Sequence, residues 1–314
     1  MSRPVIFLMG PTASGKTDLA VRLVERLPVE IISVDSAMVY RGMDIGTAKP
    51  SPAVRARAPH RLIDICDPAE AYSAGRFRED ARREIEDVFG RGRVPLLVGG
   101  TGLYFRALQR GLSVLPSANQ AVRERLSDEA ARSGWPALHR RLAAVDPASA
   151  GRIHANDPQR IQRALEVFEL TRRPLSEFFL NTAHDALPYP LVRMVLAPAD
   201  RGQLRERARR RYLAMLEQGL LDEIQALFRR GDLRAALPSM RLVGYRQGWR
   251  HLAGEISRQD MVAQAVTATQ QLAKRQLTWL RSEEDAEWFD ADSAKLLDNA
   301  LKFLERNAKL PVRV

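Results

Sequence analysis

An apolar run followed at once by a glycine-rich loop constrains the fold more than any other stretch of the sequence. The run is Val5–Met9, and the next eight residues read Gly-Pro-Thr-Ala-Ser-Gly-Lys-Thr. In the spacing G-x-x-x-x-G-K-T, backbone N–H groups point inward at a phosphate, and the N-terminus of the following helix adds partial positive charge. We expect Lys16 to hold the terminal phosphate and Thr17 to hold Mg²⁺. The predicted phosphate-binding residues are Gly10, Pro11, Thr12, Ala13, Ser14, Gly15, Lys16 and Thr17.

The composition is that of a globular protein with a sizeable core. The chain has 314 residues, of which 45% are hydrophobic, enough for one large domain or two ordinary ones. Val5–Met9 is too short for a signal sequence or a membrane span, so we expect a cytoplasmic protein with no membrane partner. The single cysteine, Cys66, excludes an internal disulfide and a cysteine-based zinc site.

The net charge of +11 favours a polyanionic partner such as nucleic acid. Basic residues exceed acidic residues most strongly between Arg193 and Arg250. Most of the basic residues are arginine, however, and such a skew can also reflect the nucleotide composition of the gene. The charge alone therefore leaves a nucleic-acid partner open.

Hydrophobic periodicity predicts an α/β protein with a P-loop NTPase-like core, in which a parallel sheet is flanked by helices. Thr17–Arg26 continues the loop as a helix, which completes a β–loop–α unit. Further strands are expected at Glu30–Val34, Arg61–Ile65, Val94–Val98 and Tyr189–Leu196, and a further helix at Ser73–Phe89. Residues 113–188 show only short helical patterns, so we expect a helical insertion there between two core segments, 1–112 and 189–314. From Gln203 onward the pattern is helical.

Two strand ends carry candidate functional groups. Glu30–Val34 delivers Asp35 and Ser36 at the edge where open α/β sheets place functional residues. Val94–Val98 instead ends in Gly99-Gly100-Thr101, although this strand of a nucleotide-hydrolysing enzyme usually ends in an acidic residue that helps hold Mg²⁺. The missing acid is evidence against an ordinary ATPase.

With these residues placed, the sequence resembles the bacterial type of tRNA dimethylallyltransferases (isopentenyltransferases) over essentially its full length. The resemblance rests on Gly10–Thr17, Asp35-Ser36, Val39–Pro50, Gly99–Tyr104, Asp157–Arg163, Val243–Arg246 and Ala273–Trp279, which agree in order and spacing.

The resemblance implies transfer of the dimethylallyl group from dimethylallyl diphosphate to N6 of the adenosine 3′-adjacent to the anticodon of tRNA, with release of diphosphate. The phosphate loop, Lys16 and a Mg²⁺ held by Thr17 would then stabilise negative charge on the leaving group. No γ-phosphate is attacked, which agrees with the missing acid after Val98. Whether ATP also binds the loop is left open, and we expect a monomer.

The resemblance also implies catalytic roles for four residues. Beside Lys16, Asp35 would be the general base that takes a proton from the adenine amino group, with a structural or metal-supporting carboxylate as the alternative. Thr101 would contact the diphosphate or the nucleotide, although a helix N-cap is the plain alternative. Arg211 matches a family arginine thought to bind diphosphate.

By family analogy, a larger set of residues would contact the anticodon stem-loop, from which the target base must be extruded. They are Asp35, Ser36, Ala37, Met38, Thr101, Arg123, Gln159, Arg160, Ile161, Gln162, Arg163, Arg241, Leu242, Val243, Gly244, Tyr245 and Arg246. Spacing alone would make Arg160 and Arg163 an exposed helix face. Met38 replaces a glutamine that is frequent in the family, and Gln270 replaces an arginine.

Two other functional classes remain open at this stage. The phosphate loop alone would favour a small-molecule kinase, and the loop combined with the basic C-terminal part would suit a non-catalytic RNA-binding protein. A kinase should phosphorylate its substrate from ATP, whereas a non-catalytic protein should bind tRNA without modifying it.

Overall fold

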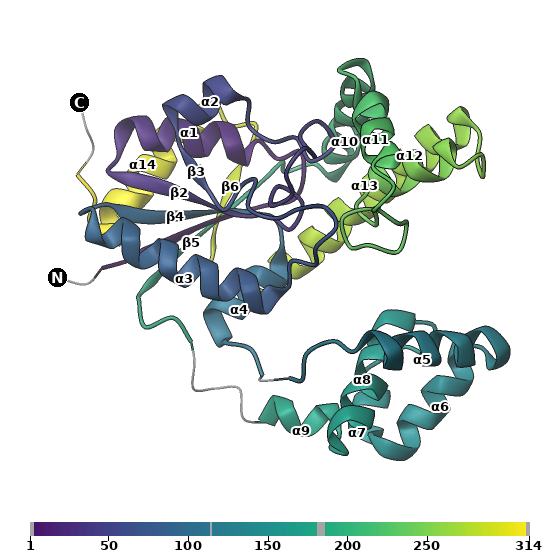
Figure 1. Cartoon of the computed structure of the whole chain (residues 1–314). Coiled ribbons are helices and arrows are strands. Elements are labelled where there is room, and N and C mark those ends of the chain that lie inside the picture. Colours follow the sequence, from purple (N-terminus) through teal and green to yellow (C-terminus); the bar gives the residue numbers. More distant parts are fainter. Residues whose placement is uncertain (1–2, 114, 181–185, 312–314) are drawn as a thin grey trace. The chain divides into compact units, whose positions relative to one another are not determined.

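The computed structural model describes residues 3–113, 115–180 and 186–311, and it divides the chain into two compact units (Figure 1). The first unit combines Met1–Arg106 with Pro188–Val314, and the second is Ala107–Leu187. Of the predicted insertion 113–188, residues up to 187 belong to the second unit, which also takes in 107–112. Residues 114 and 181–185 of that segment lie outside the described residues.

The first unit is built on a six-stranded sheet in the order β3-β2-β4-β1-β5-β6. All five neighbouring pairs are parallel, as expected. The strands are β1 Val5–Met9, β2 Val29–Val34, β3 His60–Arg61, β4 Val94–Gly99, β5 Leu191–Ala197 and β6 Glu287–Asp290. Every residue of β1 is buried, because the strand lies inside the sheet and both of its faces are covered.

Helices cover both faces of this sheet (Figure 1). The helices of this unit are α1 Lys16–Arg26, α2 Pro52–Arg57, α3 Ala74–Gly90, α4 Gly102–Arg110, α10 Arg201–Glu217, α11 Leu220–Arg229, α12 Tyr245–Leu252, α13 Arg258–Leu280 and α14 Leu296–Ala308. On one face, α1 and α14 share an apolar core with β1, to which Leu23, Leu304 and Ile6 belong. Elsewhere in the unit, the ring of Phe105 in α4 packs against the ring of Phe7 in β1, with 4.9 Å between the ring centres. The sheet therefore presents its carboxyl edge between two covered faces.

Two details of the sequence-based prediction were wrong. The strand expected at Arg61–Ile65 is only His60–Arg61, because Leu62 and Asp64 have φ angles of 61° and 59°, which break an extended backbone. The C-terminal part is not wholly helical, since β6 pairs with β5 along the sheet edge. It is four residues long, and only Phe289 of the four is buried.

The second unit is helical in its described residues. It contains the end of α4 and α5 Gln120–Ser133, α6 Trp135–Val145, α7 Pro147–Ala150, α8 Pro158–Thr171 and α9 Leu175–Leu180. Asn119, Asp146 and Asp157 cap α5, α7 and α8 by accepting backbone N–H bonds in the first turn. No helix in the described part of the chain is long and apolar enough to cross a membrane.

Candidate active site

The phosphate loop joins β1 to α1 at the carboxyl edge of the sheet. Ala13 and Gly15 have positive φ angles of 62° and 85°, which turn the backbone. A Cβ atom on Gly10 would lie 2.3 Å from the carbonyl oxygen of Leu196, so a larger residue does not fit there. Because α1 begins at Lys16, its unpaired N–H groups and dipole lie at the loop. The loop thus has the form of an anion cradle.

Lys16, Arg211 and Asp35 interact electrostatically beside this loop. The half-buried Lys16 folds back so that its Nζ donates to the carbonyl oxygen of Pro11 at 2.6 Å. Burial lowers the pKa of Lys16 to about 7, the Arg211 charge lowers it too, and the Asp35 carboxylate acts against both. Burial also lowers the pKa of Arg211, against the raising effect of Asp35. The structure therefore brings α1, α10 and the end of β2 together with two cations and one carboxylate.

Asp35 and Thr101 follow neighbouring parallel strands, in which Val34 of β2 is paired with Gly99 of β4. Asp35 Oδ1 accepts the Ala37 N–H at 2.8 Å, which fixes the carboxylate at the strand end. The Thr101 hydroxyl accepts the Ser36 N–H at 3.1 Å and thereby ties the two strand ends together.

The glycine at the end of β4 is required by this close approach. A Cβ atom on Gly99 would lie 2.0 Å from the Val34 carbonyl oxygen. Thr101 also precedes α4, and its carbonyl oxygen accepts the N–H groups of Tyr104 and Phe105. The backbone of Thr101 therefore lies at the start of α4, as the helix-cap alternative expects. Its hydroxyl, however, is bonded to Ser36.

Gln276 of α13 braces the site, although the sequence assigned it no role beyond membership of a motif. Its Oε1 accepts the Thr12 N–H at 2.8 Å, and its Nε2 donates to the Gly100 carbonyl oxygen at 2.9 Å. One side chain therefore links the phosphate loop to the turn that carries Thr101. Next to this bridge, the ring of Trp279 packs closely against Gly102. A Cβ atom on Gly102 would lie only 2.5 Å from this ring.

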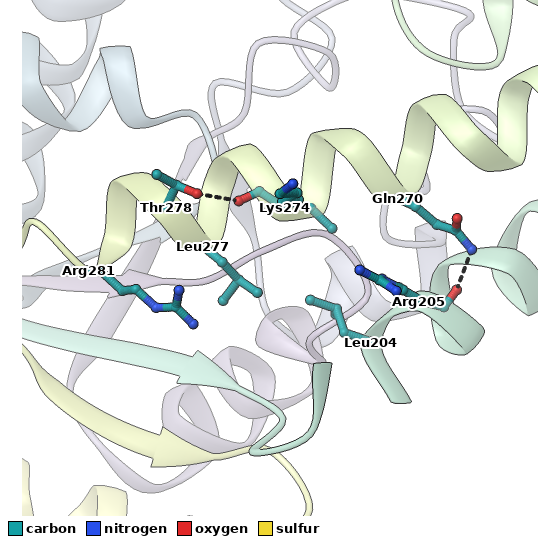
Figure 2. A pocket seen from close by; sticks show the side chains of 8 residues that line it. Leu204, Arg205, Gln270, Lys274, Leu277, Thr278 and Arg281 are labelled. Atoms are coloured by element: carbon teal, nitrogen blue, oxygen red, sulfur yellow. Dashed lines mark hydrogen bonds between the residues drawn. The ribbon is translucent and has the colours of Figure 1, made fainter. Parts of the chain in front are cut away.

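A pocket between α10 and α13 adjoins the phosphate loop (Figure 2). Its apolar side includes Leu204, Ala273 and Leu277, which form a small apolar cluster with Ala197, and Ala13 of the loop packs against this cluster. The other lining residues are Arg205, Gln270, Lys274, Thr278 and Arg281. The three basic residues among them make this face suited to an anionic partner. Gln270 turns back to the carbonyl oxygen of Arg205 at 3.4 Å, a contact drawn in Figure 2.

Comparison with known proteins identifies the family. The model of the IPP transferase family matches residues 38–283. The chain belongs to the IPP transferase family. It is 66% identical over 282 residues to the tRNA dimethylallyltransferase of Thioalkalivibrio sulfidiphilus, covering 90% of this chain and 88% of that protein. Its identity to the tRNA dimethylallyltransferase of Nitrosococcus oceani is 57% over 302 residues, with 96% of each chain covered.

Solved structures of IPP transferases have the same fold. The full-length tRNA isopentenylpyrophosphate transferase of Bacillus halodurans superposes with a TM-score of 0.70 at 36% identity, covering 98% of this chain and 99% of that one. A eukaryotic dimethylallyltransferase, described as acting on tRNA, gives a TM-score of 0.77 at 26% identity, with 98% of this chain and 77% of that chain covered.

Apart from Thr101, the residues predicted to contact tRNA in the first unit form two segments. Asp35, Ser36, Ala37 and Met38 are half-buried after β2. The segment 241–246 lies in the turn before α12 and at its start, where Arg241 and Arg246 are exposed and Leu242 and Val243 half-buried. Gly244 has a φ of 91°, and Tyr245 is fully buried. Of this second segment, the two arginines are thus the side chains free to meet a polyanion.

The α8 residues predicted to contact tRNA divide into exposed and internally bonded groups. Gln159 and Arg160 are exposed, and the side chain of Arg160 is 71% accessible. Ile161 belongs to the apolar core of the second unit. Gln162 donates to the Arg123 carbonyl oxygen at 2.9 Å.

Arg123 and Arg163 both bind the buried carboxylate of Glu166. The distances are 2.8 Å from Arg123 Nε and 2.7 Å from Arg163 Nη1. These bonds lower the pKa of Glu166 against the effect of its burial. The predicted tRNA contacts at Arg123 and Arg163 therefore compete with a role inside the helical unit, which the sequence did not indicate.

Proposed function

We propose that this protein transfers the dimethylallyl group of dimethylallyl diphosphate to N6 of the adenosine 3′-adjacent to the anticodon of tRNA. The observation that carries the proposal is the electrostatic interaction of Lys16, Arg211 and Asp35 beside the phosphate loop. Two cations suit a diphosphate, and one carboxylate suits a proton acceptor. Membership of the IPP transferase family favours this reaction over the kinase and the non-catalytic RNA-binding alternatives.

In the proposed reaction the allylic C–O bond of the donor breaks and a C–N bond to N6 forms. Negative charge grows on the departing diphosphate, where the loop N–H groups, Lys16 and Arg211 would stabilise it. The adenine amino group must lose one proton as it attacks, and the Asp35 carboxylate would accept it. General bases of this kind contribute about 10²–10⁴ in rate. Thr101, bonded to Ser36 beside Asp35, would contact the diphosphate or the base.

The residues at the loop also fit a magnesium ion. Mg²⁺ in phosphate sites keeps several waters and takes one or two protein oxygens besides the phosphate oxygens. Within the described residues the Thr17 hydroxyl, in the first turn of α1, makes no hydrogen bond and could serve as such a ligand. A bound Mg²⁺ would neutralise charge on the leaving diphosphate.

The tRNA side of the proposal rests on charge. Arg160, Arg241 and Arg246 are exposed, and Arg205, Lys274 and Arg281 line the pocket beside the phosphate loop. Exposed cations of this kind neutralise backbone phosphates, while the extruded base would enter the site itself. A monomeric, cytoplasmic enzyme is part of the same proposal.

Transfer is tested with unmodified tRNA, Mg²⁺ and dimethylallyl diphosphate labelled in the prenyl group. We expect label in tRNA from wild type and none from Lys16→Met, and no label should enter a tRNA that lacks adenosine at the target position. A parallel reaction with ATP labelled at the γ-phosphate tests the kinase alternative. Absence of prenyl label with tRNA that binds the protein would refute the proposal.

A further inference from the structure

The carboxylate of Glu223, in the first turn of α11, accepts four hydrogen bonds. Its Oε2 accepts the backbone N–H groups of Asp44 and Ile45 at 2.7 and 2.8 Å. Its Oε1 accepts the Gly46 N–H at 3.1 Å and the Tyr245 hydroxyl at 2.5 Å. One carboxylate thus holds the loop after β2 and the first residue of α12.

The fit around this carboxylate is close. Tyr245 is fully buried, and a Cβ atom on Gly46 would lie 2.6 Å from its ring. The same atom would lie 2.8 Å from Leu220, the first residue of α11. Glu223 also lies at the N-terminus of α11, where the helix dipole favours an anion. The Tyr245 side chain is therefore committed to the inside of the protein.

From Asp44 a chain of contacts leads back to the segment after β2. Lys49, whose side chain is 2% exposed, binds Asp44 Oδ1 at 2.7 Å. Its Nζ also donates to the carbonyl oxygen of Tyr40 at 2.5 Å, two residues after Met38. Tyr40 in turn donates its N–H to the carbonyl oxygen of Ala37 at 3.3 Å, so the loop that Glu223 holds is linked to the segment 35–38 through Lys49 and Tyr40.

We infer that Glu223 is a positioning residue for tRNA, which fixes the segment 35–38 and the segment 241–246 relative to each other. The inference rests on the proposed function and deepens it. The base-contacting and phosphate-contacting parts of the tRNA site lie on these separate segments. The Glu223 carboxylate bonds Tyr245 of the second segment directly, and it reaches the first through the loop 44–46, Lys49 and Tyr40. Tyr245 acts through this bond, and its exposed neighbours Arg241 and Arg246 meet the tRNA.

The test compares Glu223→Gln with Asp222→Asn, which removes the same charge from the same turn of α11 at an exposed position. The amide of Gln offers one acceptor oxygen in place of two. Its NH₂ group is a donor and would face backbone N–H groups of residues 44–46, which are donors as well. We expect Glu223→Gln to raise both the KM and the directly measured Kd for tRNA by roughly 10- to 100-fold, the effect of losing bonds to a charged group. The KM for dimethylallyl diphosphate should change less than about two-fold, and Asp222→Asn should leave all these constants unchanged.

Tyr245→Phe gives a second measurement in a conservative variant. It should weaken tRNA binding in the same direction, and its effect should be smaller in the Glu223→Gln background than in wild type, since both changes break one bond. The inference would be overturned if Glu223→Gln raised the KM for tRNA and the KM for dimethylallyl diphosphate equally. An unchanged Kd for tRNA in the folded variant would overturn it too. A wild-type protein that binds tRNA but transfers no prenyl group would remove the proposed reaction alone, because the Kd measurement needs no turnover.

Discussion

Gln276 accepts the backbone N–H of Thr12 at 2.8 Å, although the two residues are 264 positions apart in the chain. The same amide donates to the carbonyl oxygen of Gly100 at 2.9 Å. Because Gly100 precedes Thr101, the bridge sets the distance between the part of the site that would hold diphosphate and the part that would meet the base. A Cβ atom on Gly100 would lie 2.5 Å from the Gln276 amide nitrogen, so the contact requires glycine.

Replacing Gln276 by Leu should reduce kcat/KM by about 10- to 100-fold, because two hydrogen bonds are lost, each contributing about 0.5–1.5 kcal/mol. Steady-state kinetics with both substrates measures the effect. The control is Gln271→Leu, which makes the same change at an exposed position of the same helix. If the two variants behave alike, the bridge is dispensable.

The lowered pKa of Lys16 predicts a pH dependence of donor binding. With a pKa of about 7, Lys16 loses its proton as the pH rises through neutrality, and the neutral amine attracts a diphosphate less. The KM for dimethylallyl diphosphate should therefore rise between roughly pH 6 and pH 8. Binding of an anion favours the charged amine, so calorimetry in buffers of different ionisation enthalpy should detect proton uptake.

Lys16→Arg separates this effect from ionisation of the donor itself. A guanidinium stays charged throughout this range, so the part of the pH dependence due to Lys16 should disappear. A KM profile identical in wild type and variant would show that Lys16 does not titrate when the donor binds.

Asp35→Asn should lower kcat by about 10²–10⁴ if Asp35 is the general base. Binding of tRNA and of the donor should stay within a few-fold, because the amide keeps the oxygen that accepts the Ala37 N–H. The variant should also shift the Lys16 titration to lower pH, since the Asp35 charge raises the pKa of Lys16. The comparison is Asp18→Asn, an exposed carboxylate in the first turn of α1. Turnover close to wild type would assign Asp35 a structural role.

Buried strands could be predicted from the sequence because each is a continuous apolar run next to turn residues. β1 and β4 illustrate this, and the parallel α/β core is confirmed. β6 could not be predicted, because three of its four residues are exposed and its position depends on pairing with β5. The local hydrophobic pattern is enough to predict a buried strand. The formation of an exposed edge strand depends on pairing with its neighbour, which the local pattern does not show.

The same division applies to the candidate site. Asp35 and Thr101 could be expected near each other, because each follows a strand of the same parallel sheet. Glu223 and Gln276 could not, because both lie on helices whose amphipathic pattern describes only the buried face. Both side chains bind backbone groups of distant loops. The periodicity of side chains along a helix contains no information about such partners. Only the motif Ala273–Trp279 marked the neighbourhood of Gln276.

Arg160 and Arg163, one turn apart on α8, should respond differently to replacement by alanine. Arg163 binds buried Glu166 at 2.7 Å and the carbonyl oxygen of Pro116 at 2.8 Å, so its loss should destabilise the helical unit by about 1–3 kcal/mol. Arg160 is 71% accessible and lies 3.4 Å from Asp157, so its loss should change stability by less than about 0.5 kcal/mol. Thermal and denaturant unfolding of the two variants measures the difference.

For tRNA binding we expect the opposite order, with the larger effect from Arg160→Ala. Arg160→Ala should weaken binding and reduce the slope of log Kd against log salt by about 1, the contribution of one phosphate contact. Arg163→Ala, measured well below its unfolding transition, should change the slope less, because its guanidinium is already held by a carboxylate. If the Arg160 slope equals that of wild type, Arg160 is a solvated surface residue. If Arg163→Ala lowers the slope without loss of stability, its ion pair with Glu166 must open when tRNA binds.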